Sequence, residues 1–417
     1  MALLQLGRVS VIAAAAFGAT GAWGQSADIA MDDQGVVTLS GLLRPGADQA
    51  PSPACADQQA AAAVVCEAEA FLATLTDDQK AQVLLPMTVE NATAWSNLPC
   101  GAQCRVGIAL ADLDEAQKSA ALRVILAASG TGTTDGFFET TAVMMGDSVL
   151  TLAQEAGLAS APTGPGGTPP DGMAPPDGMT PPDGMAPPDG MPPPDGAGGG
   201  LVYSADNYFI AFFGTPSVDQ TWQLQFGGHH LATLHTYVSG TETSATPYFV
   251  GVEPKVWSVD GTVYSPLTDD RDAMVAMLGS LTADQLASAK LDQVFSDVLL
   301  GPGQDGQFPD AAVGLSVADL TQEQKDLVLV AMSKWVADTN DQSAAAIMQG
   351  YAAQLDQTYI AFSGDASLTH HADYVRIDGP GVWIEFVCQN GVVFGDQIHY
   401  HTIWRDQVSD YGAVYDF

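Results

Sequence analysis

The sequence predicts an α+β fold in which two diverged copies of one unit follow each other in tandem. Three observations support this prediction. A helix-start pattern occurs four times, and one stretch of the first half recurs in the second half. In each half, helical patterns also come before strand-like patterns, which favours about four mainly antiparallel strands per copy over a doubly wound sheet.

The first 24 residues have the features of a secretory signal peptide. Arg8 precedes an apolar run at 9–22, and small residues flank the expected cut before Gln25. We therefore expect an exported protein, periplasmic or extracellular. The run is too short to span a bilayer, no cysteine follows the cut to carry a lipid, and no later segment is long enough for a membrane span. Residues 25–67 lack periodicity and are expected to form an exposed lead-in.

The charge balance restricts the partners of the protein. The chain has 49 acidic and 13 basic residues and a formal net charge of −36. A surface this negative repels phosphate backbones and anionic lipids, so we expect no nucleic-acid partner. A small-molecule substrate or a metal ion is the expected partner, and the acidity itself is explained by adaptation to a salty exterior or by solubility.

The cysteines predict two local disulfides. Cys55 and Cys66 are close in sequence, as are Cys100 and Cys104, although four cysteines allow three pairings. Cys388 lies in an apolar run and is expected to be a buried thiol.

Helix starts are marked by capping boxes, in which Thr or Asp is followed three residues later by Gln. The four boxes are Thr76/Gln79, Asp114/Gln117, Thr282/Gln285 and Thr321/Gln324. Acidic residues crowd the first turn after each box, where the helix dipole favours them. We therefore predict a helix after each box.

The duplication is visible in matched stretches. Residues 106–113 match 313–320, and residues 208–212 resemble 359–362. We place the first copy at 68–254 and the second at 255–417. The strands of the first copy are expected near 207–213, 222–226, 230–238 and 247–252, and those of the second near 358–363, 373–378, 382–387 and 398–404.

An inserted loop at 159–200 accounts for the shorter spacing of the later matches. It repeats Pro-Pro-Asp-Gly-Met, which can form neither a helix nor a central strand and predicts an extended linker. Capture of copper(I) by its regularly spaced methionines is the functional alternative.

Histidines give the clearest chemical signal. All seven lie beyond residue 228, and His399 and His401 share one face of the strand predicted at 398–404, together with Arg405. Two imidazoles at positions i and i+2 can hold one metal ion. The equivalent positions of the first copy, Pro247 and Phe249, are apolar.

A possible metal site follows from these residues. Glu385, in an otherwise apolar strand, completes a His-His-Glu set with His399 and His401, which is the ligand mixture of catalytic zinc or non-haem iron. His230 is expected to be a fourth ligand or a general base, and Arg405 to orient an anionic or carbonyl oxygen. A salt bridge between Glu385 and Arg405 or Arg376, or a hydrogen-bonded core network, is the structural alternative.

Several short motifs, in order, resemble those of the bacterial family known as domain of unknown function 3500. They cover residues 68–412 and are Trp95-Ser96-Asn97-Leu98-Pro99, Gly228-His229-His230-Leu231, Thr246-Pro247-Tyr248-Phe249-Val250-Gly251, Arg376-Ile377-Asp378-Gly379-Pro380, Ile384-Glu385-Phe386 and His399-Tyr400-His401 with Trp404-Arg405-Asp406. The chain departs from this resemblance by the inserted loop and by Ile398, where Asn is expected. The resemblance implies no particular reaction.

The sequence thus predicts an exported protein with a polar cleft, built mostly by the second copy, that binds zinc, copper or iron. A metal-dependent hydrolase or oxidoreductase is one hypothesis. A non-catalytic metal-binding or ligand-binding protein is the second, and a structural histidine network without metal is the third.

Overall fold

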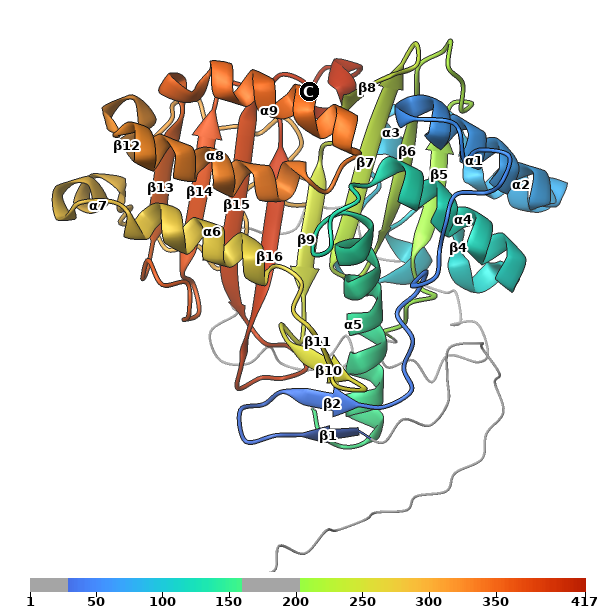
Figure 1. Ribbon diagram of the computed structural model, residues 1–417, viewed down its shortest axis with the longest axis horizontal. Helices are drawn as coiled ribbons and strands as arrows, with labels where there is room; N and C mark the ends of the chain where they lie inside the picture. Colours follow the sequence, from blue (N-terminus) through green and yellow to red (C-terminus); the bar gives the residue numbers. More distant parts are fainter. Residues whose placement is uncertain (1–28, 160–202) are drawn as a thin grey trace, which may run out of the picture.

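The structure is a computed structural model that describes residues 29–159 and 203–417. It has a large sheet, a small sheet and helices, most of which lie over one face of the large sheet (Figure 1). The prediction of an α+β fold is confirmed. The predicted signal peptide lies outside the described residues, as does nearly all of the inserted loop.

The helices fall into two sets, one on each side of residue 203. The first set is α1 (Ala60–Thr74), α2 (Asp77–Val83), α3 (Val89–Ala92), α4 (Glu115–Ala128) and α5 (Phe137–Glu155). The second is α6 (Thr268–Gly279), α7 (Ala283–Ala289), α8 (Gln322–Val336) and α9 (Asp341–Ala353). All four predicted capping boxes are present, at the starts of α2, α4, α7 and α8. The prediction of these helix starts is confirmed.

The strands of the large sheet run in the order β12-β13-β14-β15-β16-β9-β7-β6-β5-β3, with β4 paired to β5 and β8 to β7. Those before residue 254 are β3 (Leu84–Leu85), β4 (Ile108–Ala109), β5 (Phe209–Phe213), β6 (Trp222–Gly228), β7 (Leu231–Val238), β8 (Thr241–Ser244) and β9 (Tyr248–Val252). The others are β12 (Leu315–Ser316), β13 (Tyr359–Ser363), β14 (Tyr374–Gly379), β15 (Val382–Asn390) and β16 (Ile398–Arg405). Every pairing in this sheet except β3 with β5 is antiparallel, as expected.

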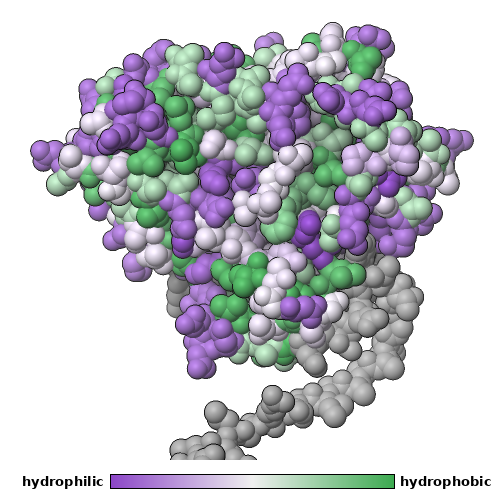
Figure 2. All heavy atoms as spheres, in the orientation of Figure 1, coloured by the Kyte–Doolittle hydropathy of each residue, from purple (hydrophilic) through white to green (hydrophobic). Residues whose placement is uncertain are grey.

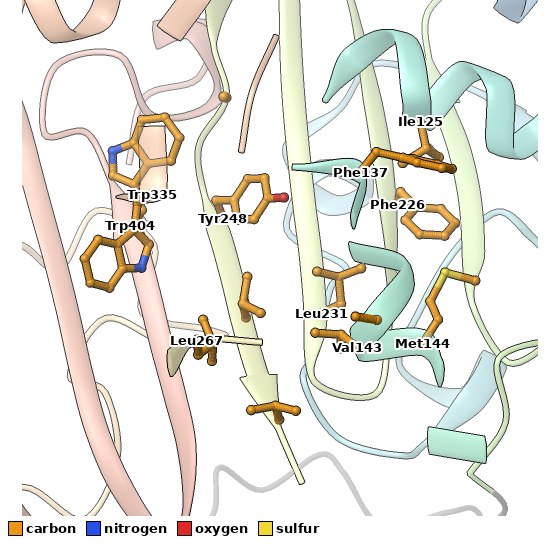
Figure 3. Packing of buried hydrophobic residues seen from close by; sticks show 14 of the residues in the cluster. Ile125, Phe137, Val143, Met144, Phe226, Leu231, Tyr248, Leu267, Trp335 and Trp404 are labelled. Atoms are coloured by element: carbon orange, nitrogen blue, oxygen red, sulfur yellow. The ribbon is translucent and has the colours of Figure 1, made fainter. Parts of the chain in front are cut away.

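One face of the large sheet is covered by helices. In Figure 1, α6, α8 and α9 lie over β13–β16, and α4 and α5 lie over the strands of the first half. Figure 3 shows Trp335 of α8 beside Trp404 of β16. The indole N–H of Trp335 donates to the hydroxyl of Thr402 at 2.7 Å. Thr402 and Trp404 thus point toward the helices, as the alternation of a strand requires.

The opposite face is covered by two long connections, residues 86–107 and 290–314. A separate apolar cluster forms there from Trp95, Ala232, Phe249, Phe295, Val298, Tyr374, Val387 and Ile403. Residues that alternate with Thr402 and Trp404 in β16 therefore face these connections. His399, His401 and Arg405 are among them, so the prediction that they share one face is confirmed.

A small sheet joins the N-terminal residues to the middle of the chain. Its strands are β1 (Ile29–Met31), β2 (Val37–Leu39), β10 (Trp257–Val259) and β11 (Thr262–Tyr264), and β2 runs parallel to β10. Val37 and Leu39 are buried in this sheet, whereas most other residues from 29 to 59 are exposed or half-buried. Tertiary pairing with β10 orders a stretch too short to show periodicity. Figure 2 shows hydrophobic surface around this sheet, where Val263 is exposed.

The cysteines pair as expected, Cys55 with Cys66 and Cys100 with Cys104, and Cys388 is a buried free thiol. Among the residues that the structure describes, no helix has both the length and the hydrophobicity that a membrane span needs.

Candidate metal centre

His399 and His401 converge at the start of β16. Their Nε2 atoms lie 3.1 Å apart, and the two side chains are buried, with 1% and 5% of their residue surfaces exposed. Two nitrogens bound to one ion at about 2.0–2.1 Å in a tetrahedral arrangement lie slightly more than 3 Å apart. The pair therefore already has nearly the spacing of two ligands to one ion.

His230 reaches the same point from a hairpin turn. Gly228 pairs with Leu231, so His229 and His230 form the two-residue loop between β6 and β7. His230 has a φ of 61°, a left-handed conformation that costs a residue with a side chain about 1–3 kcal/mol and often occurs at functional sites. Two backbone contacts hold the turn: the His230 N–H donates to the Asn97 carbonyl at 3.0 Å, and the His230 carbonyl accepts from the Gly251 N–H.

Gly251 leaves the space that the histidines occupy. It pairs with His401 across the β9–β16 ladder. A Cβ at this position would lie 2.8 Å from Cδ2 of His401 and 2.9 Å from Cδ2 of His230, closer than side chains tolerate. The two rings can therefore approach each other only over a glycine.

Among the described residues, two groups of three side chains could each hold a metal ion. In each group the three possible ligand atoms lie within 4.8 Å of one another. The first is His230, His399 and His401. Its rings meet at interplanar angles of 37°, 70° and 78°, with centroids 4.8–5.3 Å apart. A metal ion lies in the plane of each imidazole that binds it. The His401 ring is steeply inclined to the other two rings, so the three can direct their lone pairs at one point.

The second group is Asp147, His229 and His230. Here the rings of His229 and His230 are stacked, with centroids 3.7 Å apart and an interplanar angle of 28°. Nearly parallel rings at this distance cannot both hold one ion in their planes. Nδ1 of His229 lies 2.7 Å from Oδ1 of Asp147, which also accepts from the Tyr208 hydroxyl through Oδ2 at 3.2 Å. We therefore interpret Asp147 and His229 as a hydrogen-bonded pair that packs against His230.

A carboxylate orients His401. Nδ1 of His401 lies 3.0 Å from Oδ1 of Asp297, in the connection 290–314. A carboxylate on Nδ1 holds the proton there and leaves Nε2 free to bind a metal, the arrangement found behind many metal-bound histidines. Burial by itself would raise the pKa of Asp297, but the contacts with His401 and the Val298 N–H lower it below its usual value.

Burial keeps His230 and His399 neutral. Burial, followed by the neighbouring histidines, lowers the pKa of His230 and of His399 well below the usual value. A neutral imidazole has a free lone pair, which is the form that binds a metal ion. His230 and His399 thus have the protonation state that metal ligands need.

Glu385 does not belong to this group, and the expectation that it completes the ligand set is not met. Its carboxylate accepts four hydrogen bonds, from the backbone N–H groups of Leu299 and Leu300, the Tyr374 hydroxyl and the Trp383 indole. It lies on the same face as His401, but two residues further along, opposite Ile403. A fully buried carboxylate is stable there because its oxygens are satisfied. These four hydrogen bonds satisfy the carboxylate, in place of the salt bridge with an arginine that was the alternative.

Arg405 is also unable to take its expected part in binding a substrate oxygen. Its guanidinium is fully buried and contacts Asp305, Asp410 and the backbone carbonyls of Leu300 and Gly301. These contacts direct the guanidinium at the connection 290–314 and at Asp410. Pattern alone could not reveal these partners, because Asp305 lies in a connection without periodicity.

The remaining histidines lie outside the centre. His370 and His371 are exposed, as expected. His235 is buried and its Nδ1 lies 2.7 Å from Oε1 of Glu242, a satisfied pair on the helix-covered face.

Sequence reasoning missed Asp297, Asp147 and Gly251. Asp147 had a signal, since it is an acid inside the apolar run 142–150 of α5. Asp297 had none, and Gly251 ended a family motif that did not reveal its role, because both roles come from contacts between segments far apart in the chain.

Comparison with known proteins agrees with the resemblance seen in the motifs. The family model described as "Protein of unknown function (DUF3500)" matches residues 57–413. No curated protein and no solved structure matches the chain. The chain therefore belongs to the DUF3500 family of proteins of unknown function.

Proposed function

We propose that the protein binds one transition-metal ion through His230, His399 and His401. The observation that carries this proposal is the convergence of three buried imidazoles, two of them with Nε2 atoms 3.1 Å apart. The carboxylate of Asp297 behind His401 supports it, because it fixes the tautomer that binds metal.

Nitrogen donors favour zinc, copper or iron over magnesium and calcium, which prefer oxygen. Among these ions the donor set does not select one by geometry. Three protein ligands leave one position of a tetrahedral ion for water or another small ligand.

Burial favours a metal-binding protein over an enzyme. Each of the three histidines is at most 5% exposed. The two cavities described in the structure are lined by other residues, one of about 300 Å³ near Lys255 and Gln397 and a smaller one near Trp95 and Phe226. Neither of these cavities among the described residues is lined by the three histidines, so retention of the metal is the function that the geometry supports best.

A metal-dependent enzyme acting on a very small substrate is the second candidate. The open fourth position supports it, since catalytic zinc sites use three protein ligands and a water. In that case the three histidines would hold the ion, which would supply Lewis-acid chemistry, and the ring of His229 stacks on that of His230 beside them.

Metal analysis tests the proposal. Protein purified without chelators should contain about one ion per chain, and His399→Ala with His401→Ala should contain none. The matched control is His370→Ala with His371→Ala, which changes two exposed histidines and should keep the ion. Wild-type protein that neither contains metal nor gains thermal stability on titration with zinc, copper or iron would contradict the proposal.

We also infer that the two halves arose by duplication. In the central ladder, Tyr248 pairs with Trp404 and Val252 with Tyr400. A two-fold axis that relates Tyr248 to Tyr400 turns the first of these pairs into the second. The sequence matches relate the same two residues. The strand order supports the same axis, since β4-β5-β6-β7-β9 and β12-β13-β14-β15-β16 meet at β9 and β16. Superposition of these two sets by a rotation far from two-fold would contradict the inference.

On this basis the metal centre is asymmetric and uses both halves. His229 and His230 occupy the turn that is Pro380 and Gly381 in the other half, between Gly379 and Val382. The expectation of a site built mostly by the second copy is replaced by one in which a hairpin turn of one half meets the central strand of the other.

Export is also part of the proposal. The two disulfides support an oxidising compartment, and the start of the sequence supports a cleaved signal. Expression of the full chain in a bacterium, followed by fractionation and mass measurement, should find a mature form beginning at Gln25 outside the cytoplasm. An uncleaved cytoplasmic chain would contradict export.

A further inference from the structure

The connection that supplies Asp297 is fastened at one end by two buried charged residues. Glu385 accepts from the N–H groups of Leu299 at 2.6 Å and Leu300 at 2.9 Å. The guanidinium of Arg405 donates to the Leu300 carbonyl at 2.9 Å and, more weakly, to the Gly301 carbonyl at 3.4 Å. The backbone of residues 299–301 is therefore held on both its N–H and its carbonyl side.

The same connection contacts the metal centre two residues earlier. Asp297 lies against His401, while its side chain remains 47% exposed. Val298 packs into the apolar cluster, and Phe295 stacks on Tyr374 with ring centroids 3.9 Å apart. Tyr374 also donates to Glu385. The segment 295–301 is thus a strap over the sheet, with the carboxylate for His401 between its two anchored parts.

Strand geometry links the fastening to the ligand. His401 and Arg405 share one face of β16, and Glu385 lies on the neighbouring strand on the same face. A shift of about 1 Å in residues 299–301 would separate Asp297 from Nδ1 of His401, because hydrogen bonds weaken steeply beyond about 3.2 Å. The two anchors therefore determine whether Asp297 can orient the histidine.

We propose that Glu385 and Arg405 are positioning residues of the metal centre, which hold the strap 295–301 so that Asp297 fixes the metal-binding tautomer of His401. This inference rests on the proposed metal binding. It gives a role to two buried charged residues that do not contact the ligand set. Burying such charges is costly unless they are paired and hydrogen-bonded, as both are here.

Zinc affinity of purified full-length variants tests the role. Asp297→Asn should lower zinc affinity about 10- to 100-fold, the usual effect of losing the carboxylate behind a metal-bound histidine. Glu385→Gln should lower it about tenfold, because the strap loosens. The double variant should bind zinc no more weakly than Asp297→Asn alone, since both changes act through the same contact.

Glu67→Gln is the matched control. Glu67 is a buried glutamate of α1 that accepts the Ser52 N–H at 2.6 Å and lies outside the metal centre. A purely structural role for Glu385 predicts lower thermal stability in both Gln variants and unchanged zinc affinity in both. That result, with normal zinc binding in the wild type, overturns this inference and leaves the proposed function intact. A wild type without zinc binding overturns the proposed function as well.

Hydrogen exchange provides a test that does not depend on Glu385→Gln folding. Zinc should slow exchange of the backbone amides in residues 298–301 of the wild-type protein, and should have a much smaller effect in Asp297→Asn. Exchange in this segment that is the same with and without zinc in the wild type would overturn the inference.

Discussion

Two buried clusters, each made of titratable groups of one kind, lie near the centre of the large sheet on opposite faces. The histidine cluster, His230, His399 and His401, lies under the long connections. The carboxylate cluster, Glu139, Asp270 and Asp338, lies among α5, α6 and the end of α8 on the helix-covered face. Each of these six residues is at most 5% exposed.

The same physics acts on both clusters. Burial and then neighbouring acids raise the pKa of Glu139 and of Asp338 well above the usual value, and that of Asp270 to about 7. Burial and then neighbouring histidines lower the pKa of His230 and His399. Desolvation and like charge thus favour the neutral form in each case.

The difference lies in what the neutral form offers. A neutral imidazole keeps a lone pair for a metal, while a neutral carboxylic acid has given one to a proton. The histidines are also arranged as a ligand set with a supporting carboxylate, whereas the three carboxylates do not form one of the close donor groups among the described residues. We therefore expect metal at one cluster and protons at the other.

Filling the space between the histidines should lower zinc affinity more than any other change proposed below. Gly251→Ala would place a Cβ within 3 Å of both His230 and His401 and push the rings apart. We expect zinc affinity to fall about 10- to 100-fold, because overpacking typically costs about 1–3 kcal/mol and here falls on the ligands themselves. Calorimetric titration measures this.

Gly350→Ala in α9 is the control for this change, since a Cβ there meets no atom within 4 Å. It should leave zinc affinity unchanged. Equal affinities in Gly251→Ala, Gly350→Ala and the wild type would show that the three histidines do not bind the metal together.

The carboxylate cluster predicts a pH effect on stability. Asp270 binds its proton more tightly in the folded chain, with a pKa of about 7, than in the unfolded chain, where 3.8 is usual. Its contribution to the free energy of unfolding is therefore complete below about pH 4 and is lost as the pH rises to about 7. In metal-free protein, Asp270→Asn should flatten this decline by an amount on the order of 2–4 kcal/mol.

Urea unfolding at several pH values measures the effect. Asp310→Asn changes an exposed aspartate and should keep the pH dependence of the wild type. A free energy of unfolding that rises between pH 4 and pH 7 in the wild type and in Asp270→Asn alike would rule out protonated carboxylates in this cluster.

The smallest effect is expected at the stacked pair beside His230. Asp147→Asn removes the carboxylate on His229 but no ligand of the proposed ion. We expect one bound ion per chain as in the wild type, with affinity reduced only a few-fold, because the packing against His230 loosens. A stoichiometry that falls from two ions to one would instead make Asp147 and His229 ligands of a second ion.

Much of the secondary structure could be predicted because its signals are local. A capping box satisfies backbone groups within one turn, so Thr282 and Gln285 mark the start of α7 wherever it packs. The alternation in β16 is equally local and correctly separated His399 and His401 from Tyr400 and Thr402. The short strands of the small sheet were missed, since β2 depends on pairing with β10 more than 200 residues later.

The candidate site was predicted in part. His399 and His401 were identifiable because adjacent positions on one strand face must lie together. Glu385 and Arg405 were assigned to the wrong task, because a buried charge reveals that it needs a partner but not which partner it has. Their partners, Leu299, Leu300 and Asp305, lie in a connection whose path no local pattern specifies.

The sequence by itself determined the family, the α+β class, the helix starts and the strand face that carries two of the histidines, because each depends on residues within a few positions of one another. Only the tertiary structure decided that His230 meets that face, that Gly251 makes room for it and that Asp297 stands behind His401. These contacts arise where β9 and β16 pair and where a long connection folds back, and such non-local contacts are set by packing of the whole sheet.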